Sequence, residues 1–79
     1  MQNKQTLSTL KPGQSGTILS LDCAHFNKRR LADLGMVPGT EIFVRRISPF
    51  GDPIQVHLRG YELTLRKEDA QHIWMEPHA

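Results

Sequence analysis

Polar and apolar residues alternate strictly in two neighbouring segments of the second half of the chain, 54–58 and 61–65. The apolar positions are Ile54, Val56, Leu58, Tyr61, Leu63 and Leu65. A period of two is typical of a strand with one buried face. Gly60 separates the two segments, so we predict two strands joined by a turn or bulge at this glycine.

Two Pro-Gly pairs precede further β-rich segments, at Pro12-Gly13 and at Pro38-Gly39. Proline presets φ at the second position of a turn, and glycine adopts the positive φ that a type II turn needs at the third. We therefore predict a turn at each pair. The first turn leads into a strand over 16–21, and the second leads into a strand over 41–47.

Between these strands, the chain predicts one short helix over 27–34. Asn27 is a suitable N-cap, because its side chain can accept a hydrogen bond from the first turn. Gly35 is suitable for the left-handed residue that follows a helix. Asp22 is an alternative cap and would lengthen the helix. The apolar positions, three residues apart and expected in the core, are Leu31 and Leu34.

The remaining segments complete a mainly β chain. Residues 48–53 contain two prolines and predict a longer hairpin loop. Residues 67–72 predict a late helical turn, and residues 73–75 predict a short closing strand whose Trp74 packs on the sheet. We expect the ends, 1–6 and 77–79, to fray. About five strands in so short a chain hide their edges best when the sheet closes into a small barrel.

Length and composition indicate one small soluble domain over 1–79, with a core of about 7–75. The chain has 79 residues, 38% hydrophobic and 23% charged. No apolar run approaches a membrane span, and the polar N-terminus lacks the apolar core of a signal peptide. The single cysteine, Cys23, suits a reducing compartment. We therefore expect a cytoplasmic protein without direct membrane insertion.

Three segments in register resemble the ferrous iron transport protein A (FeoA) family. The central one is the run RLADLGMVPGT at 30–40, followed by PFGDPI at 49–54 and RGYELTLRK at 59–67. The opening segment, with Leu7, Leu10, Pro12-Gly13 and Ile18, also fits. Each segment alone is a weak turn-and-strand pattern, but three in the expected order are fairly specific.

The resemblance implies an SH3-like barrel with a helical insertion. It also implies a non-enzymatic cytosolic accessory of ferrous iron uptake that supports ferrous iron transport protein B (FeoB), a membrane protein with a cytosolic GTPase domain. Regulation of the GTPase and assembly of the transporter both remain open. The same fold occurs as the C-terminal domain of metal-dependent repressors, which carry a winged helix ahead of it. Only some ten residues precede the first predicted strand, so we expect no DNA-reading domain.

The residues offer no clear metal site or catalytic site. Cys23 and His25 give two metal ligands at most, and the chain has no CxxC, HxxxH or HExxH motif. The other histidines, scattered along the chain, are His57, His72 and His78. No serine or cysteine lies in a nucleophile elbow. We therefore expect no cofactor, no metal site and no enzymatic activity.

The basic triplet Lys28-Arg29-Arg30 is an oddity. With Asn27 as N-cap, three cations occupy the first helical turn, where the helix dipole favours anions. A local rule broken without visible compensation often marks function. We therefore predict that this face contacts an acidic patch on a protein partner. A solvated helix face, or a helix that begins at Asp22, is the alternative, and an arginine supplied in trans to a GTPase is another hypothesis for Arg29 or Arg30.

Met36 and Phe50 complete the predicted partner-binding set, which also contains Lys28, Arg29 and Arg30. Phe50 lies at the tip of a proline-bounded loop, where it either folds back onto the core or serves as an interface anchor. The runner-up function is a nucleic-acid-binding barrel. Because the net charge is only +2 and the aromatic residues are few, we expect nucleic acid to be an unlikely partner. A weak homo-oligomer remains open.

Overall fold

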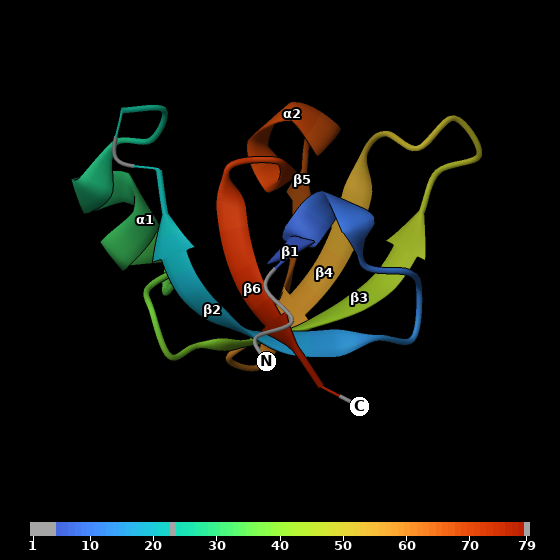
Figure 1. Ribbon diagram of the computed structural model, residues 1–79, viewed down its shortest axis with the longest axis horizontal. Helices are drawn as coiled ribbons and strands as arrows, with labels where there is room; N and C mark the ends of the chain where they lie inside the picture. Colours follow the sequence, from blue (N-terminus) through green and yellow to red (C-terminus); the bar gives the residue numbers. More distant parts are fainter. Residues whose placement is uncertain (1–4, 23, 79) are drawn as a thin grey trace.

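The protein is described here by a computed structural model that covers residues 5–22 and 24–78, with Lys28 described by its backbone only. Within these residues six antiparallel strands form one sheet in the order β1-β6-β2-β3-β4-β5 (Figure 1). The strands are β1 (Gln5–Thr6), β2 (Ser15–Leu21), β3 (Glu41–Ile47), β4 (Ile54–Leu58), β5 (Tyr61–Leu65) and β6 (Ile73–Pro77). The helical elements are the 3-10 helix η1 (Leu7–Thr9), α1 (Lys28–Leu34) and α2 (Lys67–Ala70).

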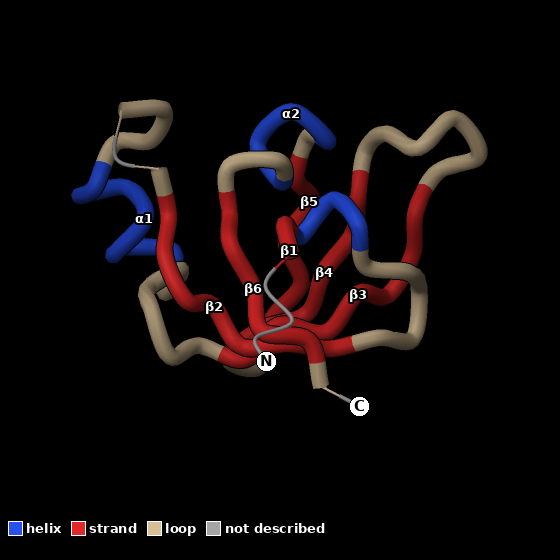
Figure 2. The backbone as a smooth tube through the Cα atoms, viewed as in Figure 1, coloured by secondary structure: helices blue, strands red, loops and turns tan. Residues whose placement is uncertain are grey.

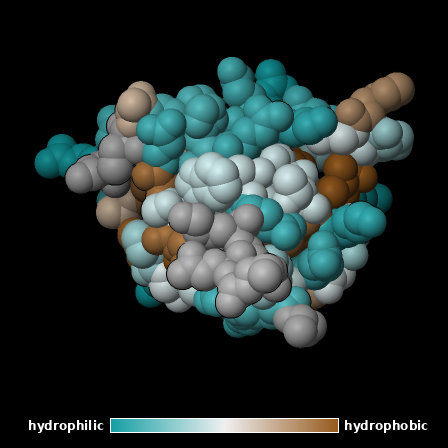
Figure 3. Space-filling view, viewed as in Figure 1, coloured by the Kyte–Doolittle hydropathy of each residue, from teal (hydrophilic) through white to brown (hydrophobic). Residues whose placement is uncertain are grey.

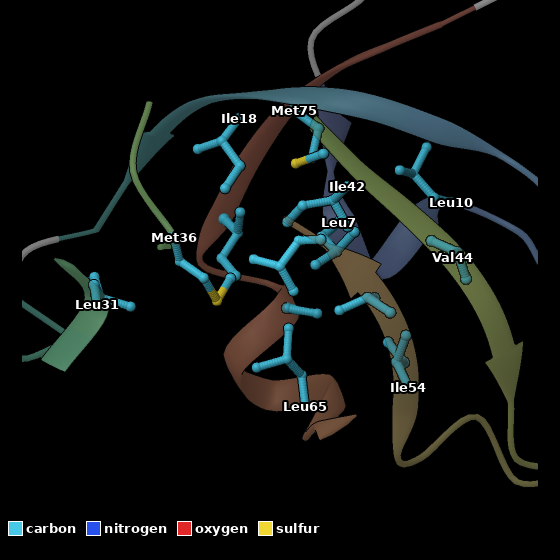
Figure 4. Packing of buried hydrophobic residues seen from close by; sticks show 14 residues of the cluster. Leu7, Leu10, Ile18, Leu31, Met36, Ile42, Val44, Ile54, Leu65 and Met75 are labelled. Atoms are coloured by element: carbon cyan, nitrogen blue, oxygen red, sulfur yellow. The ribbon is translucent and has the colours of Figure 1, made fainter. Parts of the chain in front are cut away.

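The sheet curls around a single apolar core, as the view of the buried side chains shows (Figure 4). Every second residue of β4 points inward and is buried, as the alternation predicts. Met36, in the segment after α1, also belongs to this core. The buried hydrophobic residues are Leu7, Leu10, Ile18, Leu31, Met36, Ile42, Val44, Ile54, Val56, Leu58, Leu65, Ala70, Ile73 and Met75. The fold class predicted from the sequence, a small mainly β SH3-like unit with a helical insertion, is therefore confirmed.

The two edge strands of the sheet, β1 and β5, do not pair with each other in the described part of the chain. Instead, η1 follows β1 and contacts α2, which follows β5. The prediction of a fully closed sheet is thus wrong in one respect, because helical elements rather than ladder hydrogen bonds cover the gap. The physical reason is length: β1 contributes only 2 residues.

The turn and helix signals of the sequence are confirmed. At the first Pro-Gly pair the Gln14 amide donates to the Lys11 carbonyl over 3.0 Å, and Gly13 has a φ of +91°. The helix begins at Lys28 with Asn27 as its cap, so the alternative start at Asp22 is wrong. Gly35 takes the left-handed conformation after the helix, with φ 81°.

The ends of the chain are more ordered than the sequence predicts. Gln5 and Thr6 pair with Met75 and Trp74, and this pairing forms β1. Residues 1–4 and 79 lie outside the described residues. At the other end Pro77 belongs to β6, and the His78 amide donates to the Ser15 carbonyl over 2.8 Å.

Candidate functional site

The structure divides the predicted partner-binding residues between two ends of the molecule. The basic first turn of α1 lies at one end of the longest axis, and the loop between β3 and β4 projects at the other end (Figure 2). Met36 lies in the core beneath the α1 end and is only 1% exposed. We therefore leave Met36 out of the contact set, because a side chain in the core offers almost no area to a partner.

The N-terminus of α1 carries positive charge that the helix itself does not neutralise. The Asn27 Oδ1 atom accepts hydrogen bonds from the amides of Arg29, at 3.0 Å, and Arg30, at 3.3 Å. The first turn contains no acidic residue. In the described part of the chain neither arginine forms an ion pair, and both are exposed. Their charges remain available to an external anion.

A groove of about 210 Å³ lies between α1 and the edge strand β5. We call it the α1–β5 groove. Its apolar lining consists of Phe26, Leu31, Leu34, Met36, Leu63 and Leu65, and its polar lining of Asn27, Arg30, Thr64 and Asp69. Arg30 thus lines the same hollow as six apolar residues. Such a groove suits an apolar side chain of a partner with a carboxylate beside it.

The C-terminal end of α1 is fixed to the β4–β5 turn. The Tyr61 hydroxyl donates to the Leu34 carbonyl, one of the groups that a helix C-terminus leaves without an internal partner. The Arg59 side chain packs over Gly35, where an added Cβ would come within 2.6 Å of Arg59 Cδ. Gly35 is therefore favoured by its positive φ, and a side chain at this position would also displace the Arg59 side chain.

A cluster of two histidines and two aspartates fixes the other end of α1, and sequence reasoning missed it. The rings of His25 and His72 stack with centroids 3.9 Å apart. His25 Nε2 lies 2.9 Å from Asp69 Oδ1, and His72 Nδ1 lies 3.1 Å from Asp22 Oδ2. The cluster joins the loop before α1 to the segment of α2 and the following turn. Phe26 packs edge-on against His25 and also lines the groove.

The Asp22 carboxylate stabilises this loop as a hydrogen-bond acceptor. Its Oδ1 atom accepts from the Ala24 amide over 3.0 Å. This hydrogen bond, aided by the one from His72, lowers the pKa of Asp22 below its ordinary value, although partial desolvation opposes the shift. Asp22 thus follows β2 and fixes the loop that leads to α1, which is a different role from the helix cap considered from the sequence.

The remaining histidines lie far from this cluster. His57, on the outer face of β4, has its Nδ1 3.8 Å from Glu62 Oε2. His78 has its Nε2 2.7 Å from Thr17 Oγ1 and its Nδ1 3.2 Å from Glu41 Oε2. Among residues 5–22 and 24–78 no three histidine, aspartate or glutamate side chains are arranged to hold a metal ion. The Cys23 half of the Cys23-x-His25 pair lies outside the described residues.

The loop over 48–53, which we call the Phe50 loop, carries the most exposed large apolar side chain in the described structure. Phe50 is 95% exposed, so it does not fold back onto the core. The space-filling view shows a pale brown protrusion at this end of the molecule, beyond a largely hydrophilic upper surface (Figure 3).

None of the helices in the described residues is long and apolar enough to cross a membrane.

A model of the FeoA domain matches residues 5–77. The chain belongs to the FeoA family. The fold of this FeoA-family protein agrees closely with a solved FeoA-like protein from Clostridium acetobutylicum, at 34% identity and a TM-score of 0.84, over 96% of this chain and 88% of that one. It is also similar to the FeoA of Stenotrophomonas maltophilia, a prokaryotic SH3 domain protein solved in complex with zinc, at 28% identity and a TM-score of 0.78, over 94% of this chain and 95% of that one.

One curated relative of this FeoA-family protein is much longer than the chain. It is the Fe(2+) transport protein A/Fe(2+) transporter FeoB fusion protein of Porphyromonas gingivalis, 31% identical over 70 residues. The match covers 89% of this chain and 8% of the relative. In that protein an FeoA part and an FeoB part therefore belong to one polypeptide. The family implied by the sequence resemblance is therefore confirmed.

Proposed function

We propose that this protein is a non-enzymatic, cytoplasmic accessory of ferrous iron uptake that binds the cytosolic part of the membrane GTPase transporter FeoB. The observation that carries the proposal is the relative in which the two parts are fused, because fusion holds interacting partners at high effective concentration. Two surfaces of this chain are available for such binding. They are the basic end with the α1–β5 groove and the Phe50 loop.

The basic end is the stronger candidate for the main contact. Arg29 and Arg30 are exposed and unpaired in the described structure, and Arg30 adjoins an apolar groove. An acidic partner surface with one protruding apolar side chain would therefore find both charge complementarity and a place to bury that side chain. The groove is fixed at both ends of α1, which reduces the entropic cost of binding. Lys28 begins the same helical turn, and we include it in the proposed contact.

The test is a pull-down of the purified cytosolic domain of FeoB with this chain at two salt concentrations. We expect a complex that weakens as salt increases, and a loss of at least about tenfold in affinity for the double variant Arg29→Glu/Arg30→Glu. Lys11→Glu is the matched control, since Lys11 is an exposed cation far from α1 in the sequence, on the η1–β2 turn. Unchanged binding by the double variant would contradict this contact, and no binding by the wild type would contradict the function.

A nucleic-acid-binding barrel is the second candidate, and one observation favours it. Phe43 is 37% exposed on the outer face of the sheet, opposite His57 and close to Arg45 in β3. An aromatic ring beside cations can stack on a base. However, Arg45 Nε lies 2.9 Å from Glu62 Oε2, which neutralises the nearest cation. Tight, salt-dependent binding of a single-stranded oligonucleotide, lost in Phe43→Ala, would favour this candidate over the first.

A further inference from the structure

The Phe50 loop is built to hold its aromatic side chain away from the protein. The Gly51 amide donates to the Ser48 carbonyl over 2.7 Å, and Gly51 takes a φ of +83°, so the tip is a closed turn. The Ser48 amide donates to the Pro53 carbonyl over 3.2 Å at the base of the loop. Phenylalanine is usually buried, yet here a hydrogen-bonded loop presents it to solvent. Such preorganisation lowers the entropy lost when a partner buries the ring.

The loop is also attached to the start of α2. The Asp52 Oδ1 atom accepts from the Lys67 amide over 2.9 Å. The Lys67 ammonium lies beside the tip, because its Nζ atom would be 3.8 Å from a Cβ built on Gly51. The Asp52 carboxylate is therefore already engaged, whereas the Lys67 ammonium forms no ion pair within the described residues.

A second cation also lies beside the loop. Arg46 lines a shallow hollow together with Ser48, Pro49 and Pro53. It is exposed, and the described structure gives it no ion pair. Glu68, next to Lys67 in α2, is an exposed carboxylate. A loop that carries an aromatic ring 95% exposed, with Arg46 and Lys67 beside it, fits an apolar pocket with carboxylates at its rim.

This surface and the basic end face away from each other. Figure 1 shows α1 and the β3–β4 loop on opposite sides of the curled sheet, along an axis on which the molecule measures 30 Å. A compact, convex partner that covers one of these ends therefore leaves the other end exposed.

We propose that the protein is bivalent and bridges two molecules of the partner, one at the α1–β5 groove and one at the Phe50 loop. This inference rests on the proposed function, since the partner at each end is the cytosolic domain of FeoB. The two contacts use different chemistry. The α1 end offers a cationic groove to an acidic, apolar protrusion, and the Phe50 loop offers an apolar protrusion to an acid-rimmed pocket.

Native mass spectrometry of the chain with excess purified FeoB cytosolic domain tests the proposal. We expect wild type to form a complex with one chain and two domains. Phe50→Ser and the double variant Arg29→Glu/Arg30→Glu should each stop at one domain, and the combined variant should bind none. Phe50→Leu should restore the larger complex, because it keeps an apolar tip. Leu19→Ser, at an apolar residue 39% exposed on β2, is the matched control and should behave as wild type.

The outcomes separate the two proposals. If wild type binds a single domain and Phe50→Ser leaves that complex unchanged, bivalency is wrong while the proposed function stands. If wild type binds no domain at all, the proposed function is wrong and bivalency with it. If Phe50→Ser instead removes binding to anionic lipid vesicles and leaves the domain complex unchanged, the Phe50 loop contacts a membrane surface and the second protein contact is wrong. Circular dichroism of Phe50→Ser should match wild type, since the side chain it removes is almost fully exposed.

Discussion

The α1 end presents a hollow and the Phe50 loop presents a protruding ring, and contacts with the rest of the protein hold both in place. At the α1 end, a short helix is fixed at both of its termini, so that a hollow with an adjoining guanidinium keeps its shape. At the other end, a loop is fixed at its base so that a ring stays outside. In both regions a contact between residues far apart in sequence adds to the local hydrogen bonds. The two surfaces depend on the same core, but we expect different substitutions to weaken partner binding at each of them.

The largest effect on stability should come from a substitution of Met36, which was predicted at the surface and lies in the core. Met36→Ala removes a side chain that is 1% exposed, so we expect a loss of about 2–5 kcal/mol of unfolding free energy. A domain of this size has only about 3–5 kcal/mol to lose. Urea denaturation measures the change, and Met36→Leu is the control that should cost less than about 1.5 kcal/mol. Unchanged stability with lost partner binding would return Met36 to the contact set.

The second effect should be confined to the α1 end. Tyr61→Phe removes the hydroxyl that donates to the Leu34 carbonyl, and we expect it to cost about 0.5–1.5 kcal/mol. Hydrogen exchange should then show faster exchange in α1 and no change in the amide of Gly51, which belongs to the Phe50 loop. An equal increase in amide exchange in α1 and at Gly51 would show that the two regions are not independent.

A smaller effect, of opposite sign, should follow from the helix dipole. Glutamates at positions 29 and 30 suit the first helical turn better than the arginines do, by about 0.3–1 kcal/mol each at low salt. Arg29→Glu/Arg30→Glu should therefore raise the melting temperature slightly while it weakens partner binding. Thermal denaturation at low and high salt measures the first change. A double variant that loses both stability and binding would indicate a structural role for these arginines.

The smallest effect should appear in acid, at the loop before α1. The pKa of Asp22 is lowered in the folded state, mainly by the Ala24 amide, so ionised Asp22 stabilises the fold above its unfolded pKa of about 3.9. This stabilisation is lost as the pH falls through the lower, folded pKa. Asp22→Asn should therefore be destabilised relative to wild type at pH 6 and approach it near pH 2. An equal difference at both pH values would contradict the assignment.

Local patterns in the sequence predict most of the fold. The alternation at 54–58 and 61–65, the two Pro-Gly turns and the Asn27 cap each depend on neighbouring residues, and each is confirmed. β1 was missed because Gln5 and Thr6 are only two polar residues, and they become a strand only through β6. The spacing of Leu7 and Leu10, both buried, was the available signal for a helical turn at this point.

The candidate site was also predictable only in part, because some of its contacts join residues far apart in the chain. The charge conflict at Arg29 and Arg30 and the tip position of Phe50 are local, and sequence reasoning found them. The stacked pair of His25 and His72 joins residues that are far apart in the chain, so no local pattern indicates it. Likewise the division of the predicted set into two ends depends on how the sheet curls, which no segment determines alone.

The pairing of β1 with β6 has a consequence for how this domain could be tethered. Because the first and last strands are neighbours, both ends of the described chain leave the molecule on one side, away from α1 and from the β3–β4 loop (Figure 1). A linker joined to either end of the described chain would leave from that side. Such a linker would let the domain reorient while the basic end and the Phe50 loop both stay uncovered.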